Sequence, residues 1–111
     1  MRDRRRFHRW DCSLKCYCWG EGFEFKAELT NLSFNGARVH TENKRSPAEG
    51  AEIEIAFLPE QNQIPDRKNQ LKARVVAVYE DGTCFGIEFY GDWDHKAEIL
   101  MPVFQKYVQV D

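Results

Sequence analysis

Five arginines stand within the first nine residues of the chain, and arginine is a side chain well suited to binding anions. Its planar guanidinium donates paired hydrogen bonds to phosphate and to the O6/N7 edge of guanine, and it stacks on flat rings. Residues 1–9 carry five arginines and one aspartate, a net charge of +4, whereas residues 10–111 carry eleven basic and seventeen acidic residues, a net charge of −6. A basic arm therefore precedes an acidic body, although a solvated terminus or a patch for DNA or acidic lipid would have the same composition.

A second group of candidate residues follows at Asn31, Ser33 and Gly36. Asn31 and Ser33 are two residues apart, so they share one face of a strand end, and the preceding alternation predicts that this face points inward. Gly36 stands where the backbone must turn or approach a ligand closely. Asparagine, serine and glycine are also the usual residues of a turn between strands, so turn and binding site are equally good interpretations of this segment taken alone.

The elements that must position these residues are predicted to be mostly strands. Apolar and polar residues alternate with period two, which is typical of half-buried strands, and Gly20–Gly22 and Glu80–Gly82 are tight-turn signals. Polar loops are expected at 43–50 and 59–69. Because no helix connects successive strands, the sheet should be antiparallel and closed into a barrel. The expected strands are 12–19, 23–30, 37–42, 53–57, 71–79 (with Leu71, Ala73, Val75, Ala77 and Tyr79 inward) and 83–90.

The C-terminal segment 92–109 has helical spacing instead. Asp92 or Asp94 can cap the helix, and Pro102 predicts a kink or a break, or the start of a second turn. An apolar stripe should plug or flank the barrel; its members are Ala97, Leu100, Met101, Phe104 and Tyr107 or Val108.

Length and composition predict one domain over residues 1–111, made of an arm (1–10), a barrel (11–90) and the helix (92–109). No apolar run approaches the roughly 20 residues of a membrane helix, and no signal peptide is visible, so a cytoplasmic protein without membrane insertion is expected. Cys12, Cys16 and Cys18 have the wrong spacing for a zinc knuckle and share one strand face with Leu14. We expect reduced, buried thiols, with no metal and no cofactor.

Taken together, Arg5-x-x-x-Arg9 and Asn31-x-Ser33-x-x-Gly36 resemble the two signature motifs of the PilZ domain, RxxxR and [D/N]xSxxG, separated by one hairpin. The resemblance extends over nearly the whole chain, through Gly86–Phe89 to the C-terminal helix. It implies a six-stranded antiparallel barrel with a C-terminal helix that binds the bacterial second messenger cyclic di-GMP.

The residue chemistry suits that ligand, which offers two phosphates and two guanines. The resemblance assigns Arg5 and Arg9 to paired contacts with guanine and phosphate, and to stacking on the bases. Asn31 would offer its carbonyl to guanine N–H groups, although asparagine in place of aspartate removes a charge-assisted bond. Ser33 would bond a phosphate or a base edge, and Gly36 would let the backbone approach.

Three further features of the arm concern the number of ligands bound and the change in conformation on binding. In such domains an arginine just before RxxxR tends to accompany an intercalated ligand dimer, and Arg4 holds that place; Arg6 is an additional candidate. Phe7 and Trp10 are expected to anchor the arm to the barrel rather than to stack on a base. The arm has little else to bury, so we expect it to be mobile until a ligand orders it and changes the surface that a partner protein meets.

Other functions fit the sequence less well than a receptor. His8, His40 and His95 form no pattern of nucleophile, base and orienting group, so no enzyme is predicted. Small barrels also bind single-stranded nucleic acid, but the outward positions here include Glu24 and Glu52, so no DNA binding is expected. A protein-interaction adaptor that binds no nucleotide remains an alternative. The downstream partner and its pathway are not specified by the sequence.

Overall fold

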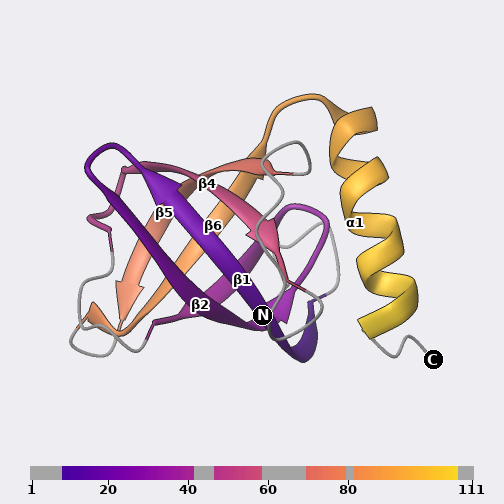
Figure 1. Ribbon diagram of the computed structural model, residues 1–111, viewed down its shortest axis with the longest axis horizontal. Coiled ribbons are helices and arrows are strands. Elements are labelled where there is room, and N and C mark those ends of the chain that lie inside the picture. The colour runs from indigo at the N-terminus through magenta and orange to yellow at the C-terminus, as the bar shows by residue number, and fades with distance from the viewer. Residues whose placement is uncertain (1–8, 42–46, 59–69, 80–81, 108–111) are drawn as a thin grey trace, which may run out of the picture.

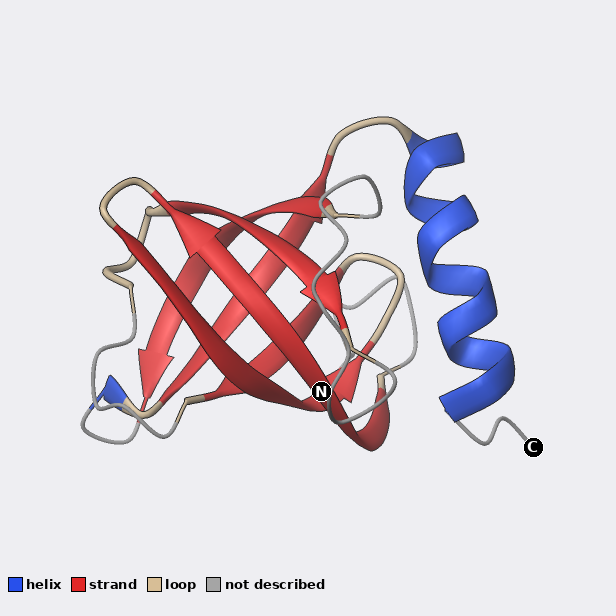
Figure 2. Ribbon diagram, viewed as in Figure 1, coloured by secondary structure: helices blue, strands red, loops and turns tan. Residues whose placement is uncertain are grey.

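The computed structural model describes residues 9–41, 47–58, 70–79 and 82–107. Six antiparallel strands close into a barrel in the order β1-β2-β3-β6-β5-β4, and one helix lies alongside it (Figures 1 and 2). This confirms the predicted architecture, although the Glu80–Asp81 part of one hairpin and most of the two polar loops lie outside the described residues. The elements are β1 (Trp10–Gly20), β2 (Phe23–Leu32), β3 (Gly36–His40), β4 (Glu52–Phe57), β5 (Leu71–Tyr79), β6 (Cys84–Tyr90) and α1 (Trp93–Tyr107).

The barrel interior is filled by the apolar half of each alternating strand, as predicted. Removing these side chains from water stabilises the fold by about 25 cal/mol per Å² of apolar surface. The strands contribute aliphatic, cysteine and aromatic residues to one continuous core, and the helix adds to the same core. Its members with the lowest exposure include Cys16, Cys18, Leu29, Leu32, Ala37, Val39, Ile55, Leu71, Ala73, Phe85 and Leu100.

Strand β5 departs from the predicted alternation. Its register against β6 slips between Val75 and Ala77, where one extra residue forms a bulge. Beyond Val75 no residue of β5 is buried: Tyr79 is 41% exposed, Val76 and Val78 are exposed to a similar degree, and Ala77 is only half-buried. The prediction that Ala77 and Tyr79 belong to the inward row is therefore wrong, because period two holds only up to the bulge.

Cys16 and Cys18 of β1 lie in the core as predicted, whereas Cys12 is only half-buried against it, and the described cysteines are all free. Burial, with the negative charges of Asp11 and Glu28, raises the pKa of Cys12 to about 11. A hydrogen bond with Cys18, together with burial, raises the pKa of Cys16 well above its ordinary value. These thiols are therefore protonated at neutral pH, and a protonated thiol is a poor nucleophile.

We expect these cysteines to resist alkylation in the folded protein. With a pKa of about 11, about one Cys12 in a thousand is a thiolate at pH 8, and the fraction rises tenfold for each pH unit up to the pKa. Labelling with iodoacetamide, followed by mass spectrometry, should be slow at pH 8 and complete only after unfolding in guanidinium. Rapid labelling of Cys12 or Cys16 in the native protein at pH 8 would contradict this account.

Helix α1 begins after Asp92, whose side chain accepts a hydrogen bond from the His95 N–H at 3.2 Å. The helix then continues through Pro102 to Tyr107, so the predicted break is wrong. Pro102 is exposed, and water can satisfy the Glu98 carbonyl that loses its intrahelical partner there.

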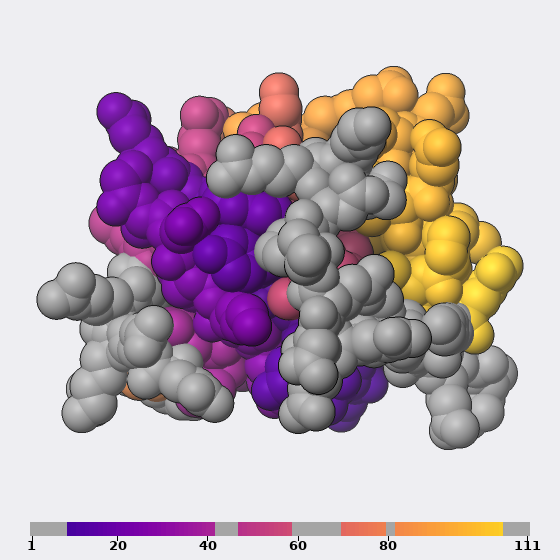
Figure 3. All heavy atoms as spheres, in the orientation of Figure 1, coloured from indigo at the N-terminus to yellow at the C-terminus, as the bar shows by residue number. Residues whose placement is uncertain are grey.

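The buried face of α1 also differs from the predicted stripe. Leu100, Val103 and Phe104 enter the core, whereas Met101 is 43% exposed. Positions 100, 103 and 104 lie on one helical face, and position 101 turns away from it. The helix flanks the barrel (Figures 1 and 3). No helix among the described residues is long and apolar enough to cross a membrane.

Candidate functional site

The start of β1 and the end of β2 bring the two sequence motifs together. Trp10 pairs with Leu32 and Asp11 pairs with Asn31 in the antiparallel register. Arg9 therefore enters the sheet beside the turn that begins at Ser33. Arg9 is partly buried, and its Nε atom is buried without a hydrogen-bond partner among the described residues. An unpaired buried donor of a charged group is costly, which makes it a suitable place for an anionic or carbonyl acceptor.

Arg4, Arg5 and Arg6, with Phe7 and His8, lie outside the described residues. Their assignment to a ligand, and the expected mobility of the arm, remain predictions.

Asn31 follows a bulge at Thr30 and pairs with Arg38 of β3. The register of β2 against β3 slips between Leu29 and Asn31, so that Leu29 and Leu32 are both fully buried. Asn31 is therefore half-exposed, and the prediction that it continues the inward row is wrong. Its Oδ1 atom accepts a hydrogen bond from the Arg38 N–H at 2.9 Å. A carbonyl oxygen has two lone pairs, so this bond leaves capacity for a second donor.

Ser33 is fully buried and organises the turn that follows β2. Its N–H donates to the Gly36 carbonyl at 2.8 Å, and its Oγ accepts from the N–H groups of Asn35 and Gly36 at 3.3 and 3.2 Å. The hydroxyl lies 2.8 Å from Asn35 Oδ1, to which it can donate. The buried Ser33 side chain thus stabilises the turn, as expected if these residues form a turn between two strands.

We expect the substitution Ser33→Ala to destabilise the protein by about 1–3 kcal/mol, because it removes the acceptor of the buried Gly36 N–H and of the partly buried Asn35 N–H. Urea unfolding followed by fluorescence measures the change. Ser13→Ala is the matched control, since that hydroxyl is exposed and bonds only Glu28 in the described structure. Equal stabilities for the Ser33 and Ser13 variants would contradict the buried role of Ser33.

Gly36 is the first residue of β3 and pairs with Glu88 of β6. A Cβ atom added there would collide with the backbone carbonyl oxygen of Ile87. Its φ is not in the left-handed region, so the requirement for glycine comes from close strand approach rather than from turn conformation. Gly36 therefore lets the start of β3 lie close against β6, whether or not a ligand also approaches it.

A cluster of four aromatic rings joins both motifs to α1. Phe34, within the turn, stacks on Trp93 with ring centroids 5.6 Å apart and on Phe104 at 5.1 Å. Trp10 meets the same Phe104 edge-on at 5.1 Å, so its ring packs against α1. The roles of Phe34, Trp93 and Phe104 in this cluster were not predicted, because a sequence does not reveal which aromatic residues of a turn and a distant helix meet.

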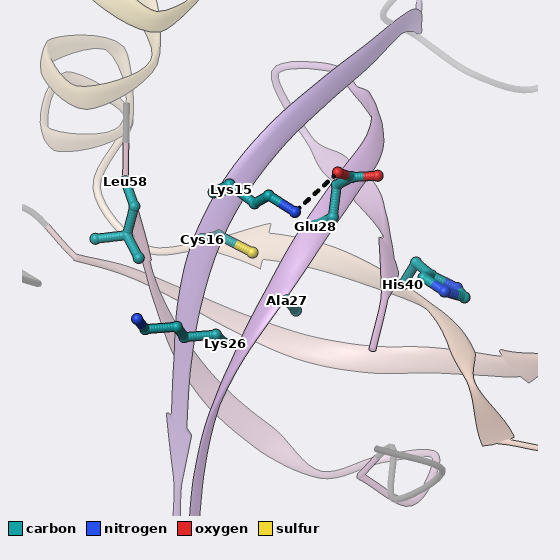
Figure 4. Close-up of a pocket in the computed structure, with 7 residues that line it drawn as sticks. All are labelled: Lys15, Cys16, Lys26, Ala27, Glu28, His40 and Leu58. Carbon is teal, nitrogen blue, oxygen red and sulfur yellow. Dashed lines mark ion pairs between the residues drawn. The ribbon is translucent and has the colours of Figure 1, made fainter. Parts of the chain in front are cut away.

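A separate pocket of about 260 Å³ lies further along the β1–β2 hairpin (Figure 4). Both acidic and basic side chains line it: Lys15 Nζ lies 3.3 Å from Glu28 Oε2. The hydrogen bond from Lys15, and to a lesser extent that from Ser13, lowers the pKa of the Glu28 carboxyl. The pocket is lined by Lys15, Cys16, Lys26, Ala27, Glu28, His40 and Leu58, none of which belongs to either motif. Across the described ranges, no group of three or more His, Cys, Asp or Glu side chains could hold a metal ion.

Comparison with solved structures places this barrel among known domains. The B. subtilis inhibitor of motility MotI/DgrA matches with a TM-score of 0.69 at 16% identity, over 95% of this chain and 51% of that one, so this chain spans about half its length. The PilZ domain of E. coli YcgR, solved with cyclic di-GMP, matches with a TM-score of 0.68 at 15% identity, over 93% and 91% of the two chains. The CeSA PilZ domain from a cellulose-synthesizing bacterium matches at 0.66 and 14% identity, over 88% and 96%.

At these identities the structural matches concern the fold, and no curated protein matches the sequence. The decisive comparison is with the family model for the PilZ domain, which matches residues 3–101 and so includes both motifs, the whole barrel and more than half of α1. With the barrel order and the motif positions described above, this match shows that the chain belongs to the PilZ domain family.

Proposed function

We propose that this protein is a receptor for cyclic di-GMP that changes the conformation of its N-terminal arm on binding and signals to a partner protein. The observation that carries the proposal is the register of β1 and β2, which sets Arg9 beside the turn of Ser33 and Gly36. Two segments some twenty residues apart thereby form one surface. The solved YcgR domain, which contains cyclic di-GMP, has the same fold and supports the choice of ligand.

The side chains at this surface complement the ligand. Arg9 supplies a guanidinium whose buried Nε has no partner among the described residues, and guanine O6/N7 or a phosphate can accept from it. Asn31 retains an acceptor lone pair, and its amide can donate. Arg5 adds a second guanidinium, while Arg4 and Arg6 add the charge that an intercalated pair of ligands would need.

Binding has to order the arm, which costs about 1–2 kcal/mol for each residue fixed. Charge-assisted hydrogen bonds contribute about 1.5–3 kcal/mol each, so each such bond offsets the ordering of about one or two residues. The arm thus changes conformation only when the ligand is present, and the surface built by arm and ligand together is what a partner protein meets. Such a change of conformation on ligand binding is what a receptor does, and it requires no chemical reaction.

Isothermal titration calorimetry with cyclic di-GMP tests the proposal, with GMP and cyclic AMP as controls. We expect saturable binding of cyclic di-GMP but not of GMP or cyclic AMP. One ligand molecule per protein chain would indicate that the ligand binds singly, and two would indicate an intercalated ligand dimer at Arg4. Single-stranded DNA at physiological salt should not compete. Absence of binding by the folded protein would overturn the proposal, and turnover of the nucleotide would indicate an enzyme instead.

A further inference from the structure

The aromatic cluster connects α1 with the turn that carries the second motif. Phe34 stands inside the Asn31–Gly36 turn, and the turn is fixed on both sides of it. The Ser33 N–H bonds the Gly36 carbonyl at 2.8 Å, and the Phe89 N–H bonds the Asn35 carbonyl at 2.8 Å. The Phe34 ring cannot move far unless the turn or the helix moves with it.

The helix side of this contact is equally specific. The ring planes of Phe34 and Trp93 differ by 26°, and those of Phe34 and Phe104 by 23°, so both contacts are stacked. Offset stacking of this kind is the favourable geometry for aromatic pairs at these separations. Phe104 is itself 6% exposed, so the inner part of the stack is closed to water.

The start of β1, which carries Arg9, contacts the same helix. Trp10 follows Arg9 directly and packs edge-on against Phe104. One helical residue therefore contacts the neighbour of Arg9 and the centre of the turn at once. The α1 backbone is no part of the barrel's strand ladder, so the helix is positioned by side-chain contacts: this cluster, the packing of Leu100 and Val103, and the 3.1 Å contact of His95 Nε2 with the Gln70 carbonyl.

We propose that Phe34, Trp93 and Phe104 are positioning residues, and that docking of α1 and binding of cyclic di-GMP stabilise each other through them. The inference rests on the proposed function. A docked helix holds the turn and the start of β1 in the arrangement that the ligand requires, and by linkage the ligand must hold the helix equally strongly. The helix then reports occupancy of the site to whatever contacts its outer face.

Trp93→Ala is the variant that tests this coupling, because Trp93 is 52% exposed and its loss leaves no large cavity in the core. We expect the affinity for cyclic di-GMP to fall by about 5-fold or more, within the range typical of coupled sites. Met101→Ala, which removes another exposed apolar side chain of α1, should bind as the parent protein does. Phe34→Leu, which keeps an apolar side chain and removes the stacking, should behave like Trp93→Ala.

Hydrogen exchange supplies a readout that a merely structural role would not move. In the parent protein, saturating cyclic di-GMP should slow amide exchange in residues 93–107, and this protection should be lost in Trp93→Ala at an equally saturating ligand concentration. If the parent protein does not bind the nucleotide, the proposed function fails and the inference with it. If the parent binds but α1 exchange is unchanged and Trp93→Ala binds normally, the receptor stands and the coupling is refuted.

Discussion

Replacing Arg9 with alanine is expected to abolish detectable binding of cyclic di-GMP while leaving the barrel folded. Arg9 is the motif arginine that the structure places beside the Ser33 turn, through the pairing of Trp10 with Leu32. A paired arginine contact to guanine contributes about 1–3 kcal/mol, and loss of the charge beside phosphate adds to it. The affinity should therefore fall by about 100-fold or more, as measured by calorimetry.

Two control variants separate the possible causes of this loss. Arg74→Ala removes an exposed arginine of β5, which faces Glu52 at 3.8 Å, and should bind normally. Arg9→Lys keeps the charge without the planar donor pair and should bind with intermediate affinity. Unchanged affinity in Arg9→Ala, with an unfolding transition like that of the parent protein, would show that the ligand does not use this residue.

Replacing Gly36 with alanine should produce the largest loss of stability among single changes in the motifs. The added methyl group would meet the Ile87 carbonyl, which is fixed in the β3–β6 ladder and cannot turn aside as a flexible side chain would. Overpacking of this kind costs about 1–3 kcal/mol or more. Thermal unfolding should show a marked fall in midpoint, and ligand affinity should fall because β3 and the turn shift together.

Gly86→Ala is the matched control for this substitution. Gly86 lies in the same sheet, on β6, and an added Cβ would meet only side-chain atoms of Tyr79 and Val76, at 3.6 Å or beyond. The control should therefore lose much less stability than Gly36→Ala. Equal losses in the two variants would mean that close approach of β3 and β6 does not explain the glycine of the motif.

Regular alternation made most of the barrel predictable. The apolar rows of β2, β3 and β6 point inward as the period-two pattern predicts, and Asp92 caps the helix as expected. Asn31 and Tyr79 were wrongly assigned to the inward rows because each follows a bulge. A bulge depends on how two strands pair, and the sequence of one strand does not record it.

The candidate site, too, was predictable from the sequence only in part. The motif positions identified Asn31, Ser33 and Gly36, but two of their structural roles came from the fold. Ser33 bonds backbone groups of its own turn, and Gly36 makes room for a carbonyl of a distant strand. The stacking of Phe34 on α1 joins residues about 60–70 positions apart, a pairing that local sequence patterns cannot indicate.

The central claim is that cyclic di-GMP is held where the start of β1 meets the Ser33 turn. Titration of ¹⁵N-labelled protein with cyclic di-GMP, followed by two-dimensional NMR, tests it most directly. We predict that the largest amide shifts fall at Arg9 to Asp11 and in residues 31–38, with smaller shifts in α1. Absence of shifts, or shifts confined to the Lys15–Glu28 pocket of Figure 4, would contradict the claim.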